Sequence, residues 1–239
     1  MPTALVIAAA GAGTRLGAGL PKALAPLADG RTLLHHCLAS VAAARAAGLA
    51  LDAVVVLTPP AGADAGRVAA EVDAGPRLDV PVHCVPGGAE RADSVRAGLA
   101  AASHALADLA PAGAPRRVLV HDAARCLTPA TVFWRVLAAL DAGATGAIPG
   151  VPVVDTIKVV GPDGRITATP RRETLRAVQP PQGFGRTVLA AAPAAGAAAT
   201  DDAAMVEALG HDVLVVEGDE RALKVTTPAD LTRAEQLLR

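Results

Sequence analysis

The chain has 239 residues, of which 52% are hydrophobic and 19% charged, and its formal net charge is −1 at pH 7. This length and composition suit one large domain and exclude bulk disorder. The near-neutral charge argues against the broad basic surface of a nucleic-acid-binding protein. One tryptophan and two phenylalanines are too few to stack bases along a single strand.

The N-terminal region has no basic stretch followed by a long apolar one, and no run of about 18 uninterrupted apolar residues occurs. We therefore expect neither a signal peptide nor a membrane span, and we predict a cytoplasmic protein. Cys37, Cys84 and Cys126 are isolated in apolar runs and lack the spacing of metal-binding or redox pairs. We expect all three to be buried, reduced thiols.

Strand-like apolar runs alternate with helix-like runs in the first 140 residues. The predicted strands cover residues 4–9, 53–58 and 80–85, and residues 117–125 are predicted as a fourth strand that runs into a loop. The predicted helices cover residues 32–48, 63–72, 90–106 and 128–140. Thr32 is the expected N-cap of the first of these helices, and Thr128 that of the last, with Pro129 in its first turn.

Unbroken apolar strands separated by helices are typical of a parallel sheet that is covered on both faces. We therefore predict an α/β fold with a Rossmann-like, mostly parallel sheet. Ligands of such sheets bind beyond the carboxyl ends of the strands. Residues 9–17, the pair Gly87-Gly88 and Asp122 each follow a predicted strand directly, so we expect them at one edge of the sheet.

The pattern changes near Gly150. The stretch "VPVVDTIKVVGPDGRITATP" contains a turn sequence between two runs rich in β-branched residues, which predicts a β-hairpin inserted into the α/β frame. A lone hairpin is marginal in water, so another subunit is a natural packing partner. Beyond it we expect a late strand at residues 211–218 and a terminal helix that Thr227 caps, with Pro228 first and Asp230 completing a capping box.

The stretch "AAAGAGTRLGAGLPKAL", residues 8–24, follows the first predicted strand and is rich in glycine. Its spacing is G-x-G-x-x-x-G rather than the dinucleotide-binding G-x-G-x-x-G, and the next strand does not end in an acidic residue. Gly17 is followed by alanine, which excludes the ATP-binding G-K-[ST] loop. The two commonest glycine-rich phosphate loops therefore do not describe this stretch.

What remains is glycine backbone that can approach phosphate oxygens, together with Arg15 and Lys22. Two cations seven residues apart suit a polyphosphate whose charge shifts during a reaction better than a single bound phosphate. The alternative at this point is a flexible loop with solvated charges.

This stretch resembles the A-A-G-x-G-x-R-x₆-P-K signature of nucleotidyltransferases that join sugar or polyol phosphates to nucleotides. Four further segments are similar to motifs of one branch, the 2-C-methyl-D-erythritol 4-phosphate cytidylyltransferase family, and occur in the family's order along nearly the whole chain. They are "GGAERADSV", "VLVHDAAR", "VPVVDTIK" and the pair "TDDA" and "LKVTTPADL".

The resemblance implies transfer of CMP from CTP to a polyol phosphate, with Mg²⁺ or another divalent cation as cofactor. It also implies one nucleotidyltransferase domain over residues 1–239 with a β-arm at about residues 150–172, through which two copies form a homodimer. The attacking phosphate monoester is already largely ionised at neutral pH, so the reaction needs no general base. Catalysis then depends on positioning and on stabilising charge at phosphorus.

The resemblance also implies a role for individual residues. The catalytic candidates, which hold the triphosphate or aim the acceptor, are Arg15, Lys22, Lys224 and Arg172. Those that bind the nucleotide are Ala9, Ala10, Gly11, Ala12, Gly13, Gly87, Gly88, Ser94 and Ala123. Those that bind the acceptor are Arg125, Thr156 and Thr200, and Asp122 is the metal ligand. Arg171 is the rival of Arg172, Lys158 is supportive, and His121 is structural.

Two departures from the family pattern lie on the acceptor side. Pro180 stands where the family has a threonine, and Ala222 where it has an asparagine beside the key lysine. A cytidylyltransferase for another polyol phosphate, such as ribitol 5-phosphate, therefore stays open as an alternative. From other classes, a non-catalytic nucleotide-binding regulator and an NAD-dependent oxidoreductase are weaker hypotheses, because the charged residues are retained and the glycine spacing does not fit.

Overall fold

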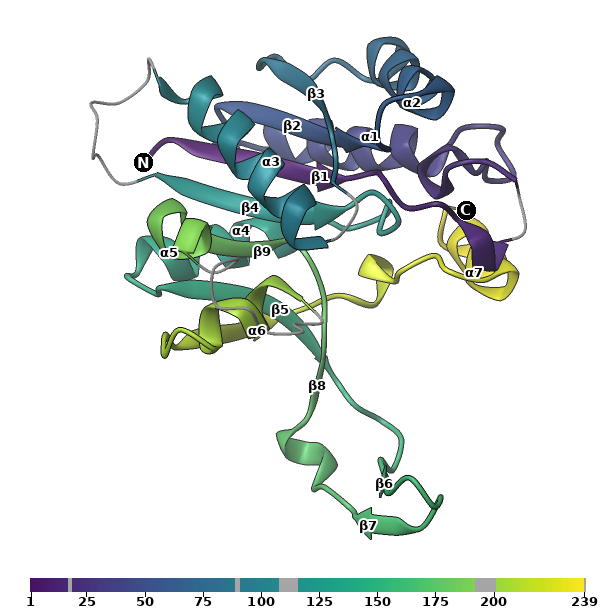
Figure 1. The fold of residues 1–239 in the computed structure, drawn as a ribbon, viewed down its shortest axis with the longest axis vertical. Helices are drawn as coiled ribbons and strands as arrows, with labels where there is room; N and C mark the ends of the chain where they lie inside the picture. The colour runs from purple at the N-terminus through teal and green to yellow at the C-terminus, as the bar shows by residue number, and fades with distance from the viewer. Residues whose placement is uncertain (17–18, 89–90, 108–115, 192–200, 239) are drawn as a thin grey trace.

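The computed structural model describes residues 1–16, 19–88, 91–107, 116–191 and 201–238. These residues form a mixed sheet with helices on both faces and a hairpin that projects from one side (Figure 1). The strand order is β10-β5-β9-β4-β1-β2-β3, and β8 pairs with β5 beside this path. The predicted α/β class and the mostly parallel, two-sided sheet are confirmed.

The centre of the sheet is made of the predicted parallel strands. β4 (Arg117–Asp122), β1 (Thr3–Ala8), β2 (Ala53–Thr58) and β3 (Val82–Pro86) pair in parallel in that order. Every residue of β2 is buried, as expected for a strand covered on both faces. The carboxyl ends of these strands therefore lie at one edge of the sheet.

The other half of the sheet was only partly predicted. β10 (Val213–Glu217) is the expected late strand and runs parallel to β5 (Gly146–Pro152). β9 (Gln182–Gly185) lies between β4 and β5 and is antiparallel to both, and β8 (Arg176–Val178) is antiparallel to β5. β9 therefore begins at the edge where β4 ends, with Gln182 opposite Val120.

Two apolar cores hold the helices on the sheet. Buried side chains of α1 (Leu33–Ala46), α2 (Ala63–Ala74), α4 (Ala130–Asp141) and α7 (Pro228–Leu237) form one core on one face. Those of α3 (Arg91–Ala105), α5 (Arg186–Ala191) and α6 (Asp202–Glu207) form the other. Figure 1 shows α3, α5 and α6 in front of the sheet, with α1 and α4 behind it.

The helix caps test the sequence reading at single residues. Thr32 and Thr227 cap α1 and α7, and the capping box with Asp230 is present, as predicted. Thr128 is wrong as a cap, because Pro129 occupies the N-cap position of α4 and the Thr128 hydroxyl donates to the Arg125 carbonyl (2.9 Å). The threonine thus stabilises the turn after β4 instead of the helix.

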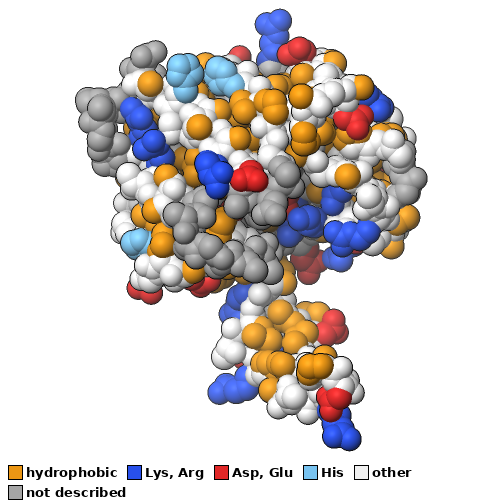
Figure 2. Space-filling model, viewed as in Figure 1, with side chains coloured by type: hydrophobic (Ala, Val, Ile, Leu, Met, Phe, Trp, Pro, Cys, Tyr) orange, Lys and Arg blue, Asp and Glu red, His pale blue; other side chains and the backbone are white. Residues whose placement is uncertain are grey.

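The predicted hairpin is confirmed as β6 (Val159–Val160) and β7 (Ile166–Ala168) around a turn at Gly161–Gly164. With η4 (Arg172–Thr174) it forms residues 153–175, here called the arm, which extends away from the sheet between β5 and β8 (Figure 1). Figure 2 shows apolar side chains gathered on the arm, and Val154, Val160 and Ile166 are 77%, 58% and 61% exposed. Such a two-stranded unit has little of its own core.

The cysteine prediction is partly wrong. Cys37 and Cys126 are buried, but Cys84 is exposed because β3 is the edge strand of the sheet. None of the helices in the described part of the chain has both the length and the apolar character that crossing a bilayer requires.

Candidate active site

The glycine-rich loop folds back on itself directly after β1. The Lys22 amide donates to the Gly11 carbonyl (2.9 Å), which closes the loop. Gly13 has a φ of +69°, and a Cβ atom there would lie 3.0 Å from the Leu20 carbonyl oxygen and 3.1 Å from the Lys22 nitrogen. Glycine is therefore required at this position both by the conformation and by the close approach of Lys22.

Lys22 opens the short helix η2 (Lys22–Leu24) directly after Pro21. Burial lowers the pKa of Lys22, and the nearby cations Lys224 and Arg15 lower it further, while Asp122 opposes them. Arg15 lies on the short helix η1 (Thr14–Leu16) and is exposed. The loop thus places two cations beside the glycines, as the sequence predicted.

Gly87, Gly88 and Ser94 adjoin this loop. A Cβ atom on Gly87 would lie 3.3 Å from the Cβ of Ala10, so the two glycine segments are neighbours at the sheet edge. The Gly88 amide donates to the Ser94 hydroxyl (3.0 Å). The predicted nucleotide-binding residues are therefore brought together, and Ser94 shapes the Gly87-Gly88 turn.

Asp122 ends β4 beside the glycine loop. It is in register with Ala8, the last residue of β1, and the Ala123 amide donates to the Ala8 carbonyl (3.1 Å). Lys224, which follows the short helix η6 (Glu220–Ala222), forms an ion pair with it, Nζ to Oδ2, of 2.8 Å. Residues about 100 positions apart in the chain thus meet at one point, an outcome that spacing alone could not establish.

Two cavities open on either side of this ion pair. A cavity of about 140 Å³ is lined by residues of the glycine loop and β4, including Gly11, Lys22 and Ala123. A cavity of about 260 Å³ is lined on the other side by Arg125, Pro180 and Gln182, among others. Asp122 and Lys224 line both cavities.

Arg125 supplies the second cation of the larger cavity. Its Nη1 donates to the Ala222 carbonyl (2.6 Å), and burial lowers its pKa from the usual value. Its Nε atom is buried and has no hydrogen-bond partner in the described part of the protein. The departure at Ala222 leaves this contact intact, because it is made by the backbone, and the alanine side chain is fully buried.

A polar wall that the sequence reading missed completes the larger cavity. The Gln182 amide nitrogen donates to Asp201 Oδ2 (2.8 Å), and its oxygen accepts from the Ala203 amide (3.0 Å). Asp201 caps α6 through its other oxygen, and the buried Asp202 follows it. The motif "TDDA" and the glutamine after Pro180-Pro181 were the available signals, but only Thr200 was assigned from them. Thr200 itself lies outside the described residues.

The arm residues do not reach this site within the chain. Thr156 is exposed, and Arg172 Nη1 donates to the Val154 carbonyl (2.9 Å). Arg171 and Arg172 both lie within 4.0 Å of Glu173. Lys158 donates to the Thr169 hydroxyl (2.9 Å). The structure therefore does not bring Arg172 and Thr156 together with Asp122.

His121 precedes Asp122 but faces the core. Its ring packs on Phe133 with centroids 5.2 Å apart, and burial lowers the pKa of His121 to about 4. A neutral, buried imidazole supports the structural role that the sequence suggested.

The part of the chain that the structure describes contains no cluster of three or more His, Cys, Asp or Glu residues suited to a metal ion. Mg²⁺ is commonly held by one or two carboxylates together with substrate phosphates and water. A lone carboxylate, Asp122, beside the phosphate-sized cavity fits that pattern.

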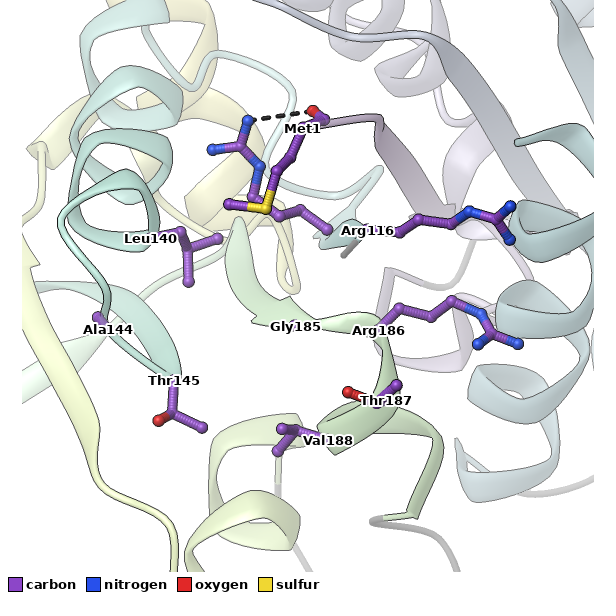
Figure 3. A pocket seen from close by; sticks show the side chains of 10 residues that line it. Met1, Arg116, Leu140, Ala144, Thr145, Gly185, Arg186, Thr187 and Val188 are labelled. Carbon is purple, nitrogen blue, oxygen red and sulfur yellow. Dashed lines mark hydrogen bonds between the residues drawn. The ribbon is translucent and has the colours of Figure 1, made fainter. Parts of the chain in front are cut away.

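A third cavity, of about 410 Å³, lies at the opposite edge of the sheet (Figure 3). It is lined by Met1, Leu140, Gly185 and Val188 among others, and by none of the predicted site residues. Arg117, the first residue of β4, reaches the Met1 carbonyl there (3.1 Å). Size alone therefore does not identify the site in this fold.

Comparison with known proteins gives one family. The family described as "2-C-methyl-D-erythritol 4-phosphate cytidylyltransferase" matches residues 3–239. The chain is 46% identical over 233 residues to the protein of that name from Nocardia farcinica, with 98% of this chain and 92% of that protein covered. It is 48% identical to a bifunctional enzyme IspD/IspF from Clavibacter michiganensis, of which it spans 54%. The crystal structure of 2-C-methyl-D-erythritol 4-phosphate cytidylyltransferase from Thermus thermophilus is similar, with a TM-score of 0.72, 34% identity and 99% and 98% of the two chains covered.

Proposed function

The chain belongs to the 2-C-methyl-D-erythritol 4-phosphate cytidylyltransferase family, and we propose that its two cavities divide the two substrates of that reaction between them. The enzyme transfers CMP from CTP to 2-C-methyl-D-erythritol 4-phosphate in isoprenoid biosynthesis. The products are 4-diphosphocytidyl-2-C-methyl-D-erythritol and pyrophosphate. A second acceptor such as ribitol 5-phosphate is not favoured by the comparisons.

The smaller cavity is our proposed site for the CTP phosphates. Backbone amides of Ala9, Ala10, Gly11, Ala12 and Gly13 face the phosphates, and Arg15 and Lys22 stabilise charge on the α-phosphoryl and leaving groups. The single observation that carries this assignment is the loop closure between the Lys22 amide and the Gly11 carbonyl, with both residues lining the smaller cavity. Cations aimed where negative charge develops are the main source of catalysis in such transfers.

Gly87, Gly88 and Ser94 are our proposed site for the cytosine. A Cβ atom on Gly87 would lie 3.1 Å from the Ser94 hydroxyl oxygen and 3.3 Å from the Ala10 Cβ, so the absence of a side chain lets this turn pack closely beside the glycine loop. The hydroxyl of Ser94 holds the Gly88 backbone in place and keeps further hydrogen-bonding capacity for a base.

Asp122 is the proposed ligand of a divalent cation, with Ala123 beside it against the nucleotide. When bound, such a cation supplies charge neutralisation of the triphosphate. Asp122 would hold this cation beside the smaller cavity. Asp122 and Lys224, which form an ion pair, line both cavities.

The larger cavity is the proposed acceptor site. Arg125 and Lys224 bind the acceptor phosphate, and an oxygen of that phosphate attacks the α-phosphorus of CTP. A new P–O bond forms while the bond between the α-phosphorus and the bridging oxygen breaks, so that the electron pair leaves with pyrophosphate. The branched, hydroxylated chain lies between Val120, Val178 and Pro180 on one side and Gln182 and Asp201 on the other.

We propose that each chain is one nucleotidyltransferase domain and that two chains form a homodimer. The arm of each chain then completes the acceptor site of the other. Its exposed apolar face and the exposed Arg172 and Thr156 support this, because neither residue reaches Asp122 within its own chain. Thr200 is proposed to join them on the acceptor phosphate. We place the reaction in the cytoplasm, where CTP is made.

The function is tested by supplying CTP, Mg²⁺ and one acceptor at a time, and by measuring pyrophosphate release. We expect turnover with methylerythritol phosphate and at least about tenfold lower kcat/KM with ribitol 5-phosphate, since pocket contacts to single groups give differences of this order. Faster formation of CDP-ribitol would contradict the acceptor assignment.

A further inference from the structure

Gln179 is a buried amide outside both proposed substrate cavities. It follows β8 directly, its exposed fraction is 5%, and it lines neither the cavity of about 140 Å³ nor that of about 260 Å³. The Gln179 backbone amide donates to the Pro149 carbonyl (2.8 Å), which continues the pairing of β8 with β5 by one residue. The backbone is therefore fixed by the sheet, and the buried side chain needs partners for its donor and acceptor groups.

The Gln179 side chain finds both partners on the backbone of Asp219. Its Nε2 atom donates to the Asp219 carbonyl (2.9 Å), and its Oε1 atom accepts from the Asp219 amide (3.0 Å). The side chain thus pairs with Asp219 as a residue of a neighbouring strand would. Gly218 permits this approach, because a Cβ atom there would overlap Oε1 of Gln179 and would lie 3.1 Å from Val151 Cγ1.

Asp219 in turn starts the short helix η6. Its carboxylate accepts from the Arg221 amide (2.8 Å), and its carbonyl also accepts from the Ala222 amide (3.0 Å). Asp219 is thus both the N-cap of η6 and the residue that Gln179 holds. A displacement of Asp219 would therefore move the start of η6 and, with it, Ala222, whose side chain is fully buried.

Arg125 and Lys224, the cations of the proposed acceptor cavity, depend on the position of η6. The Ala222 carbonyl accepts from Arg125 Nη1 (2.6 Å), and Lys224 lies two residues further along the chain. Val225 ties the far end of this segment to the turn after β4, since its amide donates to the Ala124 carbonyl (2.9 Å). Residues 219–225 are thus held at both ends, by the Gln179 side chain and by the turn after β4.

We propose that Gln179 is a positioning residue for CMP transfer, whose amide fixes η6 so that Arg125 and Lys224 are aligned at the acceptor cavity. Gln179 lines neither substrate cavity and acts through the Asp219 backbone. The inference rests on the proposed function of the larger cavity. A misplacement of about 1 Å caused by a residue away from the chemistry can cost about 100-fold in rate, so loss of this anchor should weaken the acceptor side of the reaction.

Gln179→Leu removes both hydrogen bonds and keeps a buried side chain of similar size. Pyrophosphate release measures kcat and KM while each substrate is varied in turn with Mg²⁺ present. We expect kcat/KM for methylerythritol phosphate to fall about 10- to 100-fold, and KM for CTP to change by about twofold or less. The matched control is Arg45→Ala, which removes a side chain that donates to the Leu51 and Leu78 carbonyls before β2 and β3, at the opposite edge of the sheet. It should lower thermal stability and leave both KM values unchanged.

Gln179→Glu tests the hydrogen-bond pattern itself. A protonated carboxyl group can donate to the Asp219 carbonyl and accept from its amide, as the glutamine does, whereas a carboxylate sets a second acceptor against that carbonyl. We expect burial and the charged residues that line the adjoining cavity to raise the pKa of the introduced carboxyl group; these residues are Glu217, Asp219, Glu220 and Arg233. The kcat/KM of this variant, divided by the wild-type value at the same pH, should therefore be highest near about pH 6 and fall about tenfold by about pH 9. The same ratio for Gln179→Leu should not change with pH.

The outcomes separate positioning from folding and from the proposed function. A selective loss of kcat/KM for the acceptor in Gln179→Leu, with recovery of Gln179→Glu at low pH, supports positioning. Wild-type kinetics in Gln179→Leu overturn it, and so does an equal rise of both KM values or a pH-independent ratio in Gln179→Glu. If Gln179→Leu does not fold, the pH dependence of Gln179→Glu decides alone. Failure of the wild type to use methylerythritol phosphate overturns the acceptor assignment itself, whatever the variants do.

Discussion

The glycine-rich loop and the arm differ in how the chain holds them in place. The loop follows β1 directly, is tied to β2 and η2 by backbone hydrogen bonds and lies over a buried core. The arm has a short hairpin, exposed apolar side chains and an arginine, Arg172, that contacts the Val154 carbonyl and Glu173, both in the arm itself. The glycine loop is thus held within its own chain, and we propose that the arm is held by the surface of a second copy.

The two departures from the family pattern, Pro180 and Ala222, do not affect the glycine loop. Pro180 and Ala222 both lie at the larger cavity, where the side chains that carry charge come from other positions. The larger cavity is lined by residues of several elements, including β9. The proposed cradle for the CTP phosphates is instead one continuous loop after β1.

Lys22→Ala should have the largest effect, because it removes a cation from the self-contained side. We expect kcat to fall by about 10²–10³, the usual loss when one donor to a developing charge is removed. The fold should persist, since Lys22 contributes charge rather than packing. Pyrophosphate release and a thermal melt measure the two effects, with Arg67→Ala on α2 as an exposed control. Wild-type kcat in Lys22→Ala would remove the loop from the mechanism.

Gly13→Ala and Gly11→Ala sharpen the picture of the loop. The first substitution strains a φ of +69° and meets Lys22, so we expect about 1–2 kcal/mol lower stability together with a higher KM for CTP. The second meets no atom within 4 Å and should leave stability unchanged while lowering CTP affinity. Denaturant unfolding and analogue binding separate the two. Equal destabilisation by both substitutions would contradict the loop geometry.

His121, buried against Phe133, gives a pH test of folding stability. Its folded pKa of about 4 lies below the value of 6.5 expected when unfolded, so between these values the unfolded chain binds the extra proton and folding weakens as pH falls. The loss should reach about 2 kcal/mol between pH 8 and pH 5, and His121→Leu should remove it. Unfolding curves at the two pH values decide, and an unchanged pH dependence in His121→Leu would assign the effect to other groups.

The sequence predicted the parallel half of the sheet and the glycine loop well, because each depends on local patterns. It did not predict β9, which is four residues long and contains two glycines. A Cβ atom on Gly183 would lie 2.5 Å from Val136 and 2.8 Å from Leu119, so this glycine allows close packing under α4 instead of a turn. Such a requirement is visible only once the helix is in place.

The site shows the same division. Arg15, Lys22 and Asp122 were identifiable from motifs that follow strands. The Gln182–Asp201 contact and the Asp122–Lys224 pair join segments 19 and 102 residues apart, and no local pattern specifies them. The arm residues were identifiable by motif, but their exposure shows that the motif alone could not say which chain they serve.

The most direct test of the account mixes two inactive variants, Lys22→Ala and Arg172→Ala, and measures pyrophosphate release. If the arm acts in the partner's site, each mixed dimer has one site with both residues intact. Random exchange in a symmetric dimer then restores about a quarter of wild-type activity. Arg171→Ala in place of Arg172→Ala tests the neighbouring arginine in the same way. Activity in the mixture no greater than the sum of the two variants, under conditions where mass measurement shows mixed dimers, would contradict a site shared between chains.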